Sequence, residues 1–212
     1  MSVFAAIKTG CFVVFSLILT GCASQSSQLK PVIPLSAQQR QLQLEQLQEF
    51  TLTGALGVKA PQESVSGSLN WQQQGPYFQA NMTNFVGISI FELETDALGA
   101  TVKADGETHQ AQSASALLDY LSGWSLPIEE MPLWLKGVAS PESFNHQWDA
   151  QGRLTSFTLK DSQQRDWQVS YVTFFPDALA LPKEIRLKAQ ADGSSIKLVV
   201  RKWQLLTLSA PA

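Results

Sequence analysis

Apolar and polar residues alternate with a period of two through most of the chain after residue 50. The alternation begins at Leu52, Leu56 and Val58. It returns in ten further short segments, at residues 65–71, 78–82, 89–94, 98–103, 107–111, 144–148, 153–160, 167–174, 184–189 and 196–203. This period is typical of β-strands that bury one face, and the pattern therefore predicts ten or eleven short strands.

Turn residues separate these segments at regular intervals. Clusters that contain Gly, Pro or Asp lie at 74–76, 105–106, 149–152 and 192–193. Such residues adopt the backbone angles of tight turns, and short turns join strands that are antiparallel neighbours. We therefore expect a mainly β (α+β) fold with one large, strongly curled antiparallel sheet.

Two stretches depart from the period of two. Ser36 can cap a helix that extends to about Glu49, and Leu44, Leu47 and Phe50 give it an apolar stripe. A second helix is expected in the middle of the chain, between the sixth and seventh predicted strands. These helices would cover one side of the sheet, and the pattern is compatible with either a packed or a hollow interior.

The N-terminal segment is typical of a lipoprotein signal. Lys8 is the only charged residue before Cys22, and the apolar run at 11–19 is too short for a comfortable membrane span. The sequence Leu19-Thr20-Gly21-Cys22 resembles the bacterial lipobox, which implies cleavage before Cys22 and its acylation. Ala23, where an Asp would signal retention in the inner membrane, implies residence in the outer membrane. An uncleaved anchor is the alternative.

These features divide the chain into three parts. Residues 1–21 are a predicted signal peptide, residues 22–35 a lipidated tether rich in Gln and Ser, and residues 36–212 one folded domain. Cys11 leaves with the signal and Cys22 carries lipid, so the mature domain contains no free thiol and no disulfide.

Composition and charge exclude several classes of function. The 212 residues carry a formal net charge of −3 without a basic run, so no nucleic-acid partner is expected. His109 and His146 lie in different predicted strands, and no zinc motif or G-x-S-x-G elbow occurs. Glu92, Glu94 and Asp96 share one strand face, which we interpret as a solvated outer surface. We therefore expect no metal, no cofactor and no enzymatic activity.

The sequence between the third and fourth predicted strands is unusual. Phe85 and Val86 lie between the turn residues Asn84 and Gly87. Exposing two large apolar side chains forgoes about 1.5–3 kcal/mol each relative to burial. The pattern alone therefore favours a continuous strand with a bulge at Gly87 and both side chains in the core. An exposed loop is the alternative.

An ordered set of motifs resembles the LolB family of outer-membrane lipoprotein receptors and spans nearly the whole mature chain. The motifs are Trp71-Gln72-Gln73, Met82-Thr83-Asn84-Phe85-Val86-Gly87, Phe91-Glu92-Leu93, the segments 122–128, 133–137, 167–171 and 181–182, and Ile196-Lys197-Leu198 with Trp203. The resemblance implies an incomplete antiparallel β-barrel whose opening is covered by helices around a hydrophobic cavity.

The resemblance also implies an activity and partners. The protein would accept triacylated lipoproteins from the periplasmic carrier LolA and insert them into the inner leaflet of the outer membrane. Affinity differences would drive this transfer without ATP. The implied partners are loaded LolA, the acyl chains of the client and outer-membrane phospholipid. We expect a monomer that is anchored at Cys22 in the outer membrane and faces the periplasm.

Two sets of site residues follow from the resemblance. The family typically has Asn-Pro-Leu-Gly where this chain has Asn84-Phe85-Val86-Gly87, so Phe85 and Val86 are expected to form a membrane-insertion loop. Strand parity selects nine candidates for the wall of the acyl-chain cavity, each of which is also suited to an ordinary core: Leu69, Trp71, Phe78, Met82, Phe91, Leu93, Trp134, Trp167 and Tyr171.

Two other functions remain open. A structural or assembly-factor lipoprotein of the outer membrane, which binds protein partners, predicts a packed interior and no acyl-chain binding. A hydrolase of lipids or glycans predicts a clustered nucleophile or acid pair, and the motif search argues against it.

Overall fold

The computed structural model describes residues 35–61, 64–123, 126 and 128–206. The predicted signal peptide at 1–21, the lipidation site Cys22 and residues 22–34 of the tether lie outside the described residues. The strands are β1 (Glu49–Lys59), β2 (Ser64–Gln74), β3 (Tyr77–Thr83), β4 (Ser89–Asp96), β5 (Gly99–Ala104), β6 (Glu107–Ala111), β7 (Phe144–Trp148), β8 (Leu154–Lys160), β9 (Asp166–Phe174), β10 (Pro182–Ala189) and β11 (Ser195–Leu205). The helices are α1 (Ala37–Gln46), α2 (Ala114–Ser122), the 3-10 helix η1 (Ile128–Glu130) and α3 (Met131–Trp134).

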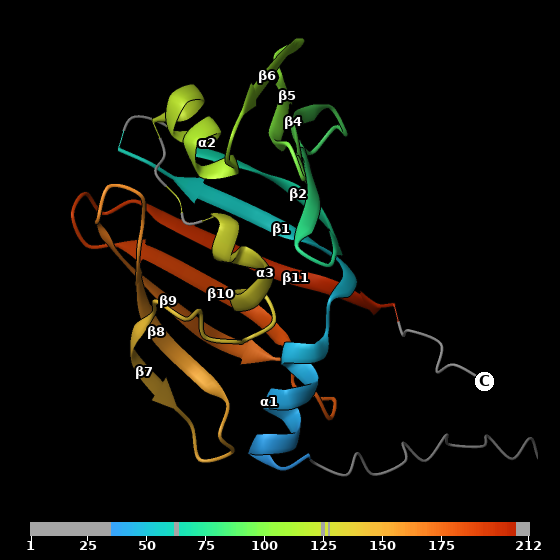
Figure 1. Cartoon of the computed structure of the whole chain (residues 1–212), viewed down its shortest axis with the longest axis vertical. Helices are drawn as coiled ribbons and strands as arrows, with labels where there is room; N and C mark the ends of the chain where they lie inside the picture. The colour runs from blue at the N-terminus through green and yellow to red at the C-terminus, as the bar shows by residue number, and fades with distance from the viewer. Residues whose placement is uncertain (1–34, 62–63, 124–125, 127, 207–212) are drawn as a thin grey trace, which may run out of the picture. The chain divides into compact units, whose positions relative to one another are not determined.

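All eleven strands belong to one antiparallel sheet, in the order β6-β5-β4-β3-β2-β1-β11-β10-β9-β8-β7. Each strand pairs with its neighbours in sequence, except that β1 pairs with β11 and that β6 and β7 lie at opposite edges. The sheet therefore stays open. Figure 1 shows it curled, with α2 and α3 on the concave side. The predicted curled, incomplete antiparallel barrel with a helical cover is confirmed.

The chain between the two edge strands supplies the helical cover. It leaves β6 at Ala111, forms α2, η1 and α3, and reaches β7 at Phe144. Ser113 caps α2, as its side chain accepts a hydrogen bond from the Ala116 amide at 3.1 Å, and Gly123 ends the helix with a φ of 67°. The cover is thus tied to both edges of the sheet by the chain itself.

Helix α1 begins where the sequence predicts and ends earlier. The Ser36 side chain accepts from the Gln39 amide, and the Gln39 side chain accepts from the Ser36 amide, which forms a capping box. The helix stops at Gln46, because Glu49 already pairs with Gln74 of β2. The predicted extension to Glu49 is wrong for this reason, and Phe50 belongs to β1.

Strand β4 separates a buried inner face from a solvated outer face. Leu93 is buried, whereas Glu92, Glu94 and Asp96 are exposed, as the alternation predicts. The next strand begins at Gly99, one residue later than the sequence predicts. Leu98 lies in the turn, because the Asp96 carboxylate accepts hydrogen bonds from the amides of Leu98 and Gly99 at 2.7 and 3.1 Å.

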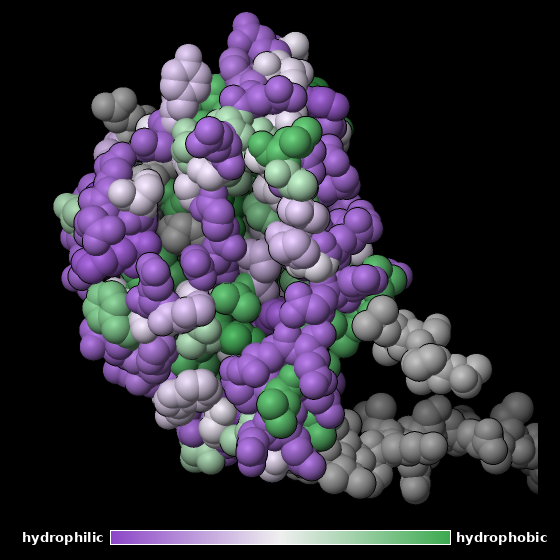
Figure 2. Space-filling view, in the orientation of Figure 1, coloured by the Kyte–Doolittle hydropathy of each residue, from purple (hydrophilic) through white to green (hydrophobic). Residues whose placement is uncertain are grey.

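The inner faces of the strands form an apolar core beneath the cover. Phe50, Leu52 and Trp71 are fully buried, and the Trp71 ring stacks on Phe78 with centroids 4.2 Å apart. Figure 2 shows hydrophobic side chains gathered inside the concave side, within a mainly hydrophilic rim. These inward residues are buried between the curled sheet and the helices.

Candidate functional site

An apolar cavity of about 70 Å³ lies between the sheet and its cover. All fourteen side chains that line it are apolar: Leu56, Val58, Leu69, Trp71, Ala80, Phe91, Leu118, Leu126, Ile128, Met131, Trp134, Leu187, Ile196 and Leu198. The walls come from β1, β2, β3, β4, β10 and β11, and the covering side comes from α2, η1, α3 and Leu126. Such a site suits hydrocarbon and offers little to a polar ligand.

Four of the nine predicted wall residues line this cavity, namely Leu69, Trp71, Phe91 and Trp134. The other five are buried in the fold outside it: Phe78, Met82, Leu93, Trp167 and Tyr171. The two-residue alternation along a strand predicts which side chains point to the inner face of the sheet. It does not predict which part of that face the helices cover. The sequence analysis missed other lining residues, such as Leu56 on β1 and Leu187 on β10. The same alternation predicts that these side chains face inward.

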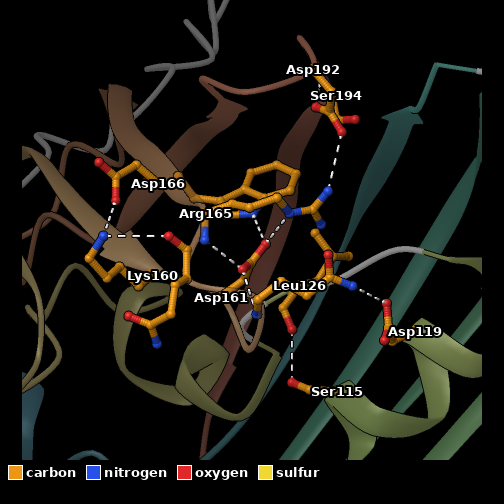
Figure 3. Close-up of polar contacts among 12 residues, drawn as sticks. Ser115, Asp119, Leu126, Lys160, Asp161, Arg165, Asp166, Asp192 and Ser194 are labelled. Atoms are coloured by element: carbon orange, nitrogen blue, oxygen red, sulfur yellow. Dashed lines mark hydrogen bonds and ion pairs between the residues drawn. The ribbon is translucent and has the colours of Figure 1, made fainter.

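Polar contacts hold α2 over the cavity. The Ser115 hydroxyl donates to the Leu126 carbonyl at 2.8 Å, and the Ser115 amide donates to the Glu129 carboxylate at 2.8 Å. The Gln163 side-chain amide donates to the Asp119 carboxylate at 2.9 Å, which ties the helix to the turn between β8 and β9 (Figure 3). The hydrogen bond to the Leu126 carbonyl contributes about 0.5–1.5 kcal/mol, and the two that carboxylates accept contribute about 1.5–3 kcal/mol each.

Helix α3 is attached to β9 and to the core. The Tyr171 hydroxyl of β9 donates to the Trp134 carbonyl at 2.6 Å, and both residues are buried. Burial also raises the pKa of Tyr171 well above its usual range, so the phenol stays protonated as a donor. The neighbouring Leu135 is fully buried. Helix α2 is also anchored in the core, because its Ala114 and Leu117 are buried there.

The turn between β8 and β9 is organised by Asp161. Its fully buried carboxylate accepts from Arg165 Nε at 2.8 Å, from Trp167 Nε1 at 3.1 Å, and from the amides of Gln163 and Arg165 (Figure 3). Burial by itself would raise the pKa of Asp161, but these hydrogen bonds and the Arg165 charge lower it below its usual value. The indole N–H of Trp167 is thus bound by the Asp161 carboxylate, and Trp167 does not line the cavity.

The loop between β3 and β4 exposes large apolar side chains. Phe85 is 96% exposed, Val86 62% and Ile88 64%. Gly87 has a φ of 85°, which closes the loop, and the ladder between the two strands ends at the pair Thr83–Ser89. The interpretation of a continuous strand with buried Phe85 and Val86 is wrong. Ile88 was missed, although its place directly after the turn glycine was a signal.

The described residues contain no group of three or more His, Cys, Asp or Glu side chains arranged to hold a metal ion. His109 lies on β6 and His146 on β7, at opposite edges of the sheet. Within the same described ranges, no helix is long and apolar enough to cross a membrane.

Comparisons with known proteins agree with this architecture. The family model "Outer membrane lipoprotein LolB" matches residues 48–203. The outer-membrane lipoprotein LolB of Aeromonas hydrophila is 31% identical over 191 residues, which cover 89% of this chain and 92% of that protein. The LolB protein of Aeromonas salmonicida is 31% identical over 208 residues, covering 97% and 99%.

Solved structures share the fold at low sequence identity. A LolA superfamily protein from Nitrosomonas europaea aligns with a TM-score of 0.51 at 9% identity, over 82% of this chain and 96% of that one. A putative outer membrane lipoprotein-sorting protein domain from Vibrio parahaemolyticus aligns with a TM-score of 0.51 at 11% identity, over 82% and 92%. The resemblance seen in the sequence motifs is confirmed by the family match. This chain belongs to the LolB family of outer membrane lipoproteins.

Proposed function

We propose that this protein accepts triacylated lipoproteins from the periplasmic carrier LolA and inserts them into the inner leaflet of the outer membrane. Acyl groups on Cys22 anchor it there, after removal of residues 1–21. Residues 22–35 form the tether, and the domain that follows faces the periplasm. Its partners are loaded LolA, the acyl chains of the client and outer-membrane phospholipid. The function requires no cofactor and no catalytic step.

The observation that carries this proposal is the apolar cavity beneath the helical cover. A cavity of about 150 Å³ lined by Leu, Ile and Phe binds benzene, whereas the present one measures about 70 Å³. An acyl chain is much larger than benzene, so binding requires the cavity to widen. The movement we infer is a displacement of α2, which polar contacts at Ser115 and Asp119 hold in place.

Energetics explain why a receptor with such a cavity is needed. Each buried methylene contributes about 0.8 kcal/mol, so acyl chains cannot cross an aqueous compartment without a carrier. Transfer from the carrier then requires only that the receptor bind the chains more tightly. The exposed Phe85 and Val86 provide the contact with the membrane into which the chains are finally released.

The two other functions are less well supported. An assembly factor does not need a cavity with entirely apolar walls, and the family match does not favour it. A lipid or glycan hydrolase needs a nucleophile or an acid pair beside its substrate. None of the fourteen cavity-lining residues is titratable or nucleophilic.

A transfer assay tests the proposal. Residues 23–212 would be mixed with LolA loaded with a radiolabelled lipoprotein, and each protein would be recovered separately. We expect the label to move to this protein. A client that stays on a carrier able to release it to another LolB receptor would contradict the proposal. The assembly-factor function would then be preferred.

A further inference from the structure

The loop Asn84–Ile88 satisfies most of its backbone amides within itself. The Asn84 side-chain oxygen accepts from the amides of Val86 and Ile88, at 3.0 Å in both cases. The Asn84 carbonyl accepts from the Gly87 amide at 3.0 Å, and the Asn84 amide donates to the Ile88 carbonyl at 2.9 Å. Four of the five amides of the loop, all except that of Phe85, thus donate inside it.

This arrangement matters if the loop leaves water. Hydrocarbon offers no partner to a backbone N–H, so an irregular segment is costly there unless its donors are satisfied internally. In water the same donors could bind solvent, and the internal hydrogen bonds would contribute little. The closed geometry therefore lowers the cost of moving these four N–H groups from water into hydrocarbon.

The opposite end of β4 provides a comparison within the same molecule. There the Asp96 carboxylate accepts from the amides of Leu98 and Gly99, and Leu98 is 91% exposed. In both turns a large apolar side chain is exposed, and a side chain of the turn accepts hydrogen bonds from its backbone amides. They differ in the closing group, because Asn84 is neutral and Asp96 carries a charge that is expensive in hydrocarbon. Of these two turns, the loop at Asn84 is therefore the one suited to a lipid phase.

The loop also presents a third apolar side chain. Ile88 is 64% exposed and follows Phe85 and Val86 after a single glycine. Taken together, the three side chains offer more apolar area than Val86 alone. Each is expected to add to the free energy of partition in proportion to the area that it buries.

We propose that Asn84 is a positioning residue that closes the β3–β4 loop with a neutral side chain, and that Ile88 enters the membrane hydrocarbon together with Phe85 and Val86. This inference rests on the proposed function, and it assigns to Asn84 and Ile88 roles in the delivery step. Acceptance of the client from LolA does not involve either residue.

Fluorescence quenching in vesicles tests the depth of Ile88. The lipidated full-length protein with Ile88→Cys would carry an NBD label, which is unique because no other free thiol is expected in the mature chain. Vesicles of phosphatidylethanolamine and phosphatidylglycerol would contain lipids with a nitroxide on the acyl chain. We expect strong quenching at position 88. The matched control, Leu98→Cys with the same label, should show little quenching.

Variants of Asn84 in the Ile88→Cys protein test the positioning role. Asn84→Ala leaves two amides unpaired, and Asn84→Asp keeps the acceptor but adds a charge. We expect either change to reduce the inserted fraction by about tenfold or more. Transfer from LolA should stay at the wild-type rate, and delivery to vesicles should slow in parallel with the loss of quenching. The retained acceptor of Asn84→Asp guards against a simple failure to fold, which circular dichroism would check.

The outcomes separate this inference from the proposed function. Equal quenching at positions 88 and 98, or full quenching in Asn84→Asp, would overturn the inference while transfer from LolA continued. A wild-type protein that accepts no client would overturn the proposed function instead.

Discussion

Phe85 and Val86 are chemically similar to core residues, and their exposure is decided by the backbone on either side. Pairing between β3 and β4 ends at Thr83–Ser89, so the residues between these positions lie beyond the ladder. Asn84 and Gly87 then close the loop within five residues. Local turn chemistry therefore outweighs the tendency of large apolar side chains to be buried.

The first prediction concerns Val86. Val86→Glu places a charge where the loop should meet hydrocarbon, at a cost of about 2.5–3.5 kcal/mol for a comparable charge deep in a membrane. We expect the variant to accept client from LolA normally and to deliver it to vesicles about a hundredfold more slowly. Leu98→Glu is the matched control and should deliver normally. Undiminished delivery by Val86→Glu would remove the loop from the mechanism.

The second prediction concerns a buried lysine. Lys136 is 3% exposed, and its ammonium donates to the Leu47 carbonyl at 2.8 Å. Burial lowers its pKa to about 8, although the charge of Glu45 acts in the opposite direction. The unfolded chain keeps this proton up to about pH 10.4, so the folded state should gain stability as pH rises from about 8 to 10.4.

This gain should amount to about 3 kcal/mol in the wild type relative to Lys136→Met. The measurement is the free energy of unfolding in urea at several pH values, with Lys188→Met as an exposed control. A difference between wild type and Lys136→Met that stays constant over this window would contradict the assignment.

At the scale of elements, the alternation of residues predicts every strand that the structure contains. A strand needs only a two-residue period and a turn at each end, and both are local properties. The errors lie at element ends, as at Glu49 and Leu98, and at Phe85 and Val86, where the pattern alone favours a continuous strand and the structure has a loop. At Glu49 and Leu98, the residue at which an element ends depends on which strand or carboxylate accepts hydrogen bonds from the backbone amides. The two-residue period does not predict that partner.

Two hairpin turns with the same pattern give the third prediction. Asp149 accepts from Arg153 Nε and from the amides of Gln151 and Arg153, as Asp161 does at the next turn. The side chain of Asp149 is 21% exposed, whereas that of Asp161 is fully buried and also accepts from Trp167. Asp161→Asn should lower the free energy of unfolding by about 3 kcal/mol, and Asp149→Asn by about 1 kcal/mol.

The difference in the free energy of unfolding between the wild type and Asp161→Asn should also depend on pH. The folded pKa of Asp161 lies below its usual value, so its stabilisation is present above the unfolded pKa of about 3.9 and is lost as pH falls through the folded pKa. Urea unfolding from pH 7 to pH 2 should therefore show the wild type approaching Asp161→Asn in acid. Equal losses for the two variants at pH 7 would show that burial of the carboxylate is unimportant.

At the scale of the whole molecule, an open sheet has two edges that could pair with another chain. β7 contains register irregularities in its pairing with β8, and Asn145 has a φ of 57°, which interrupts a regular ladder. β6 is only five residues long and begins with the exposed Glu107. Short, irregular or charged edges hinder pairing between molecules.

The fourth prediction is therefore that residues 23–212 are monomeric. Sedimentation equilibrium over a wide concentration range should give the mass of one chain. A stable dimer would contradict this expectation and would direct attention to β6 and β7 as its interface.

The sequence by itself determined the alternating strands, the turn positions, the Ser36 cap, the lipobox resemblance and membership of the LolB family. These features depend on local periodicity, backbone preferences and ordered motifs, all of which are readable along one chain. Only the tertiary structure decided that Leu69, Trp71, Phe91 and Trp134 meet at one cavity, and that Phe85, Val86 and Ile88 remain exposed. A period of two determines on which face of the sheet a side chain lies. The residues that it contacts depend on the register of all eleven strands and on the position of the helical cover.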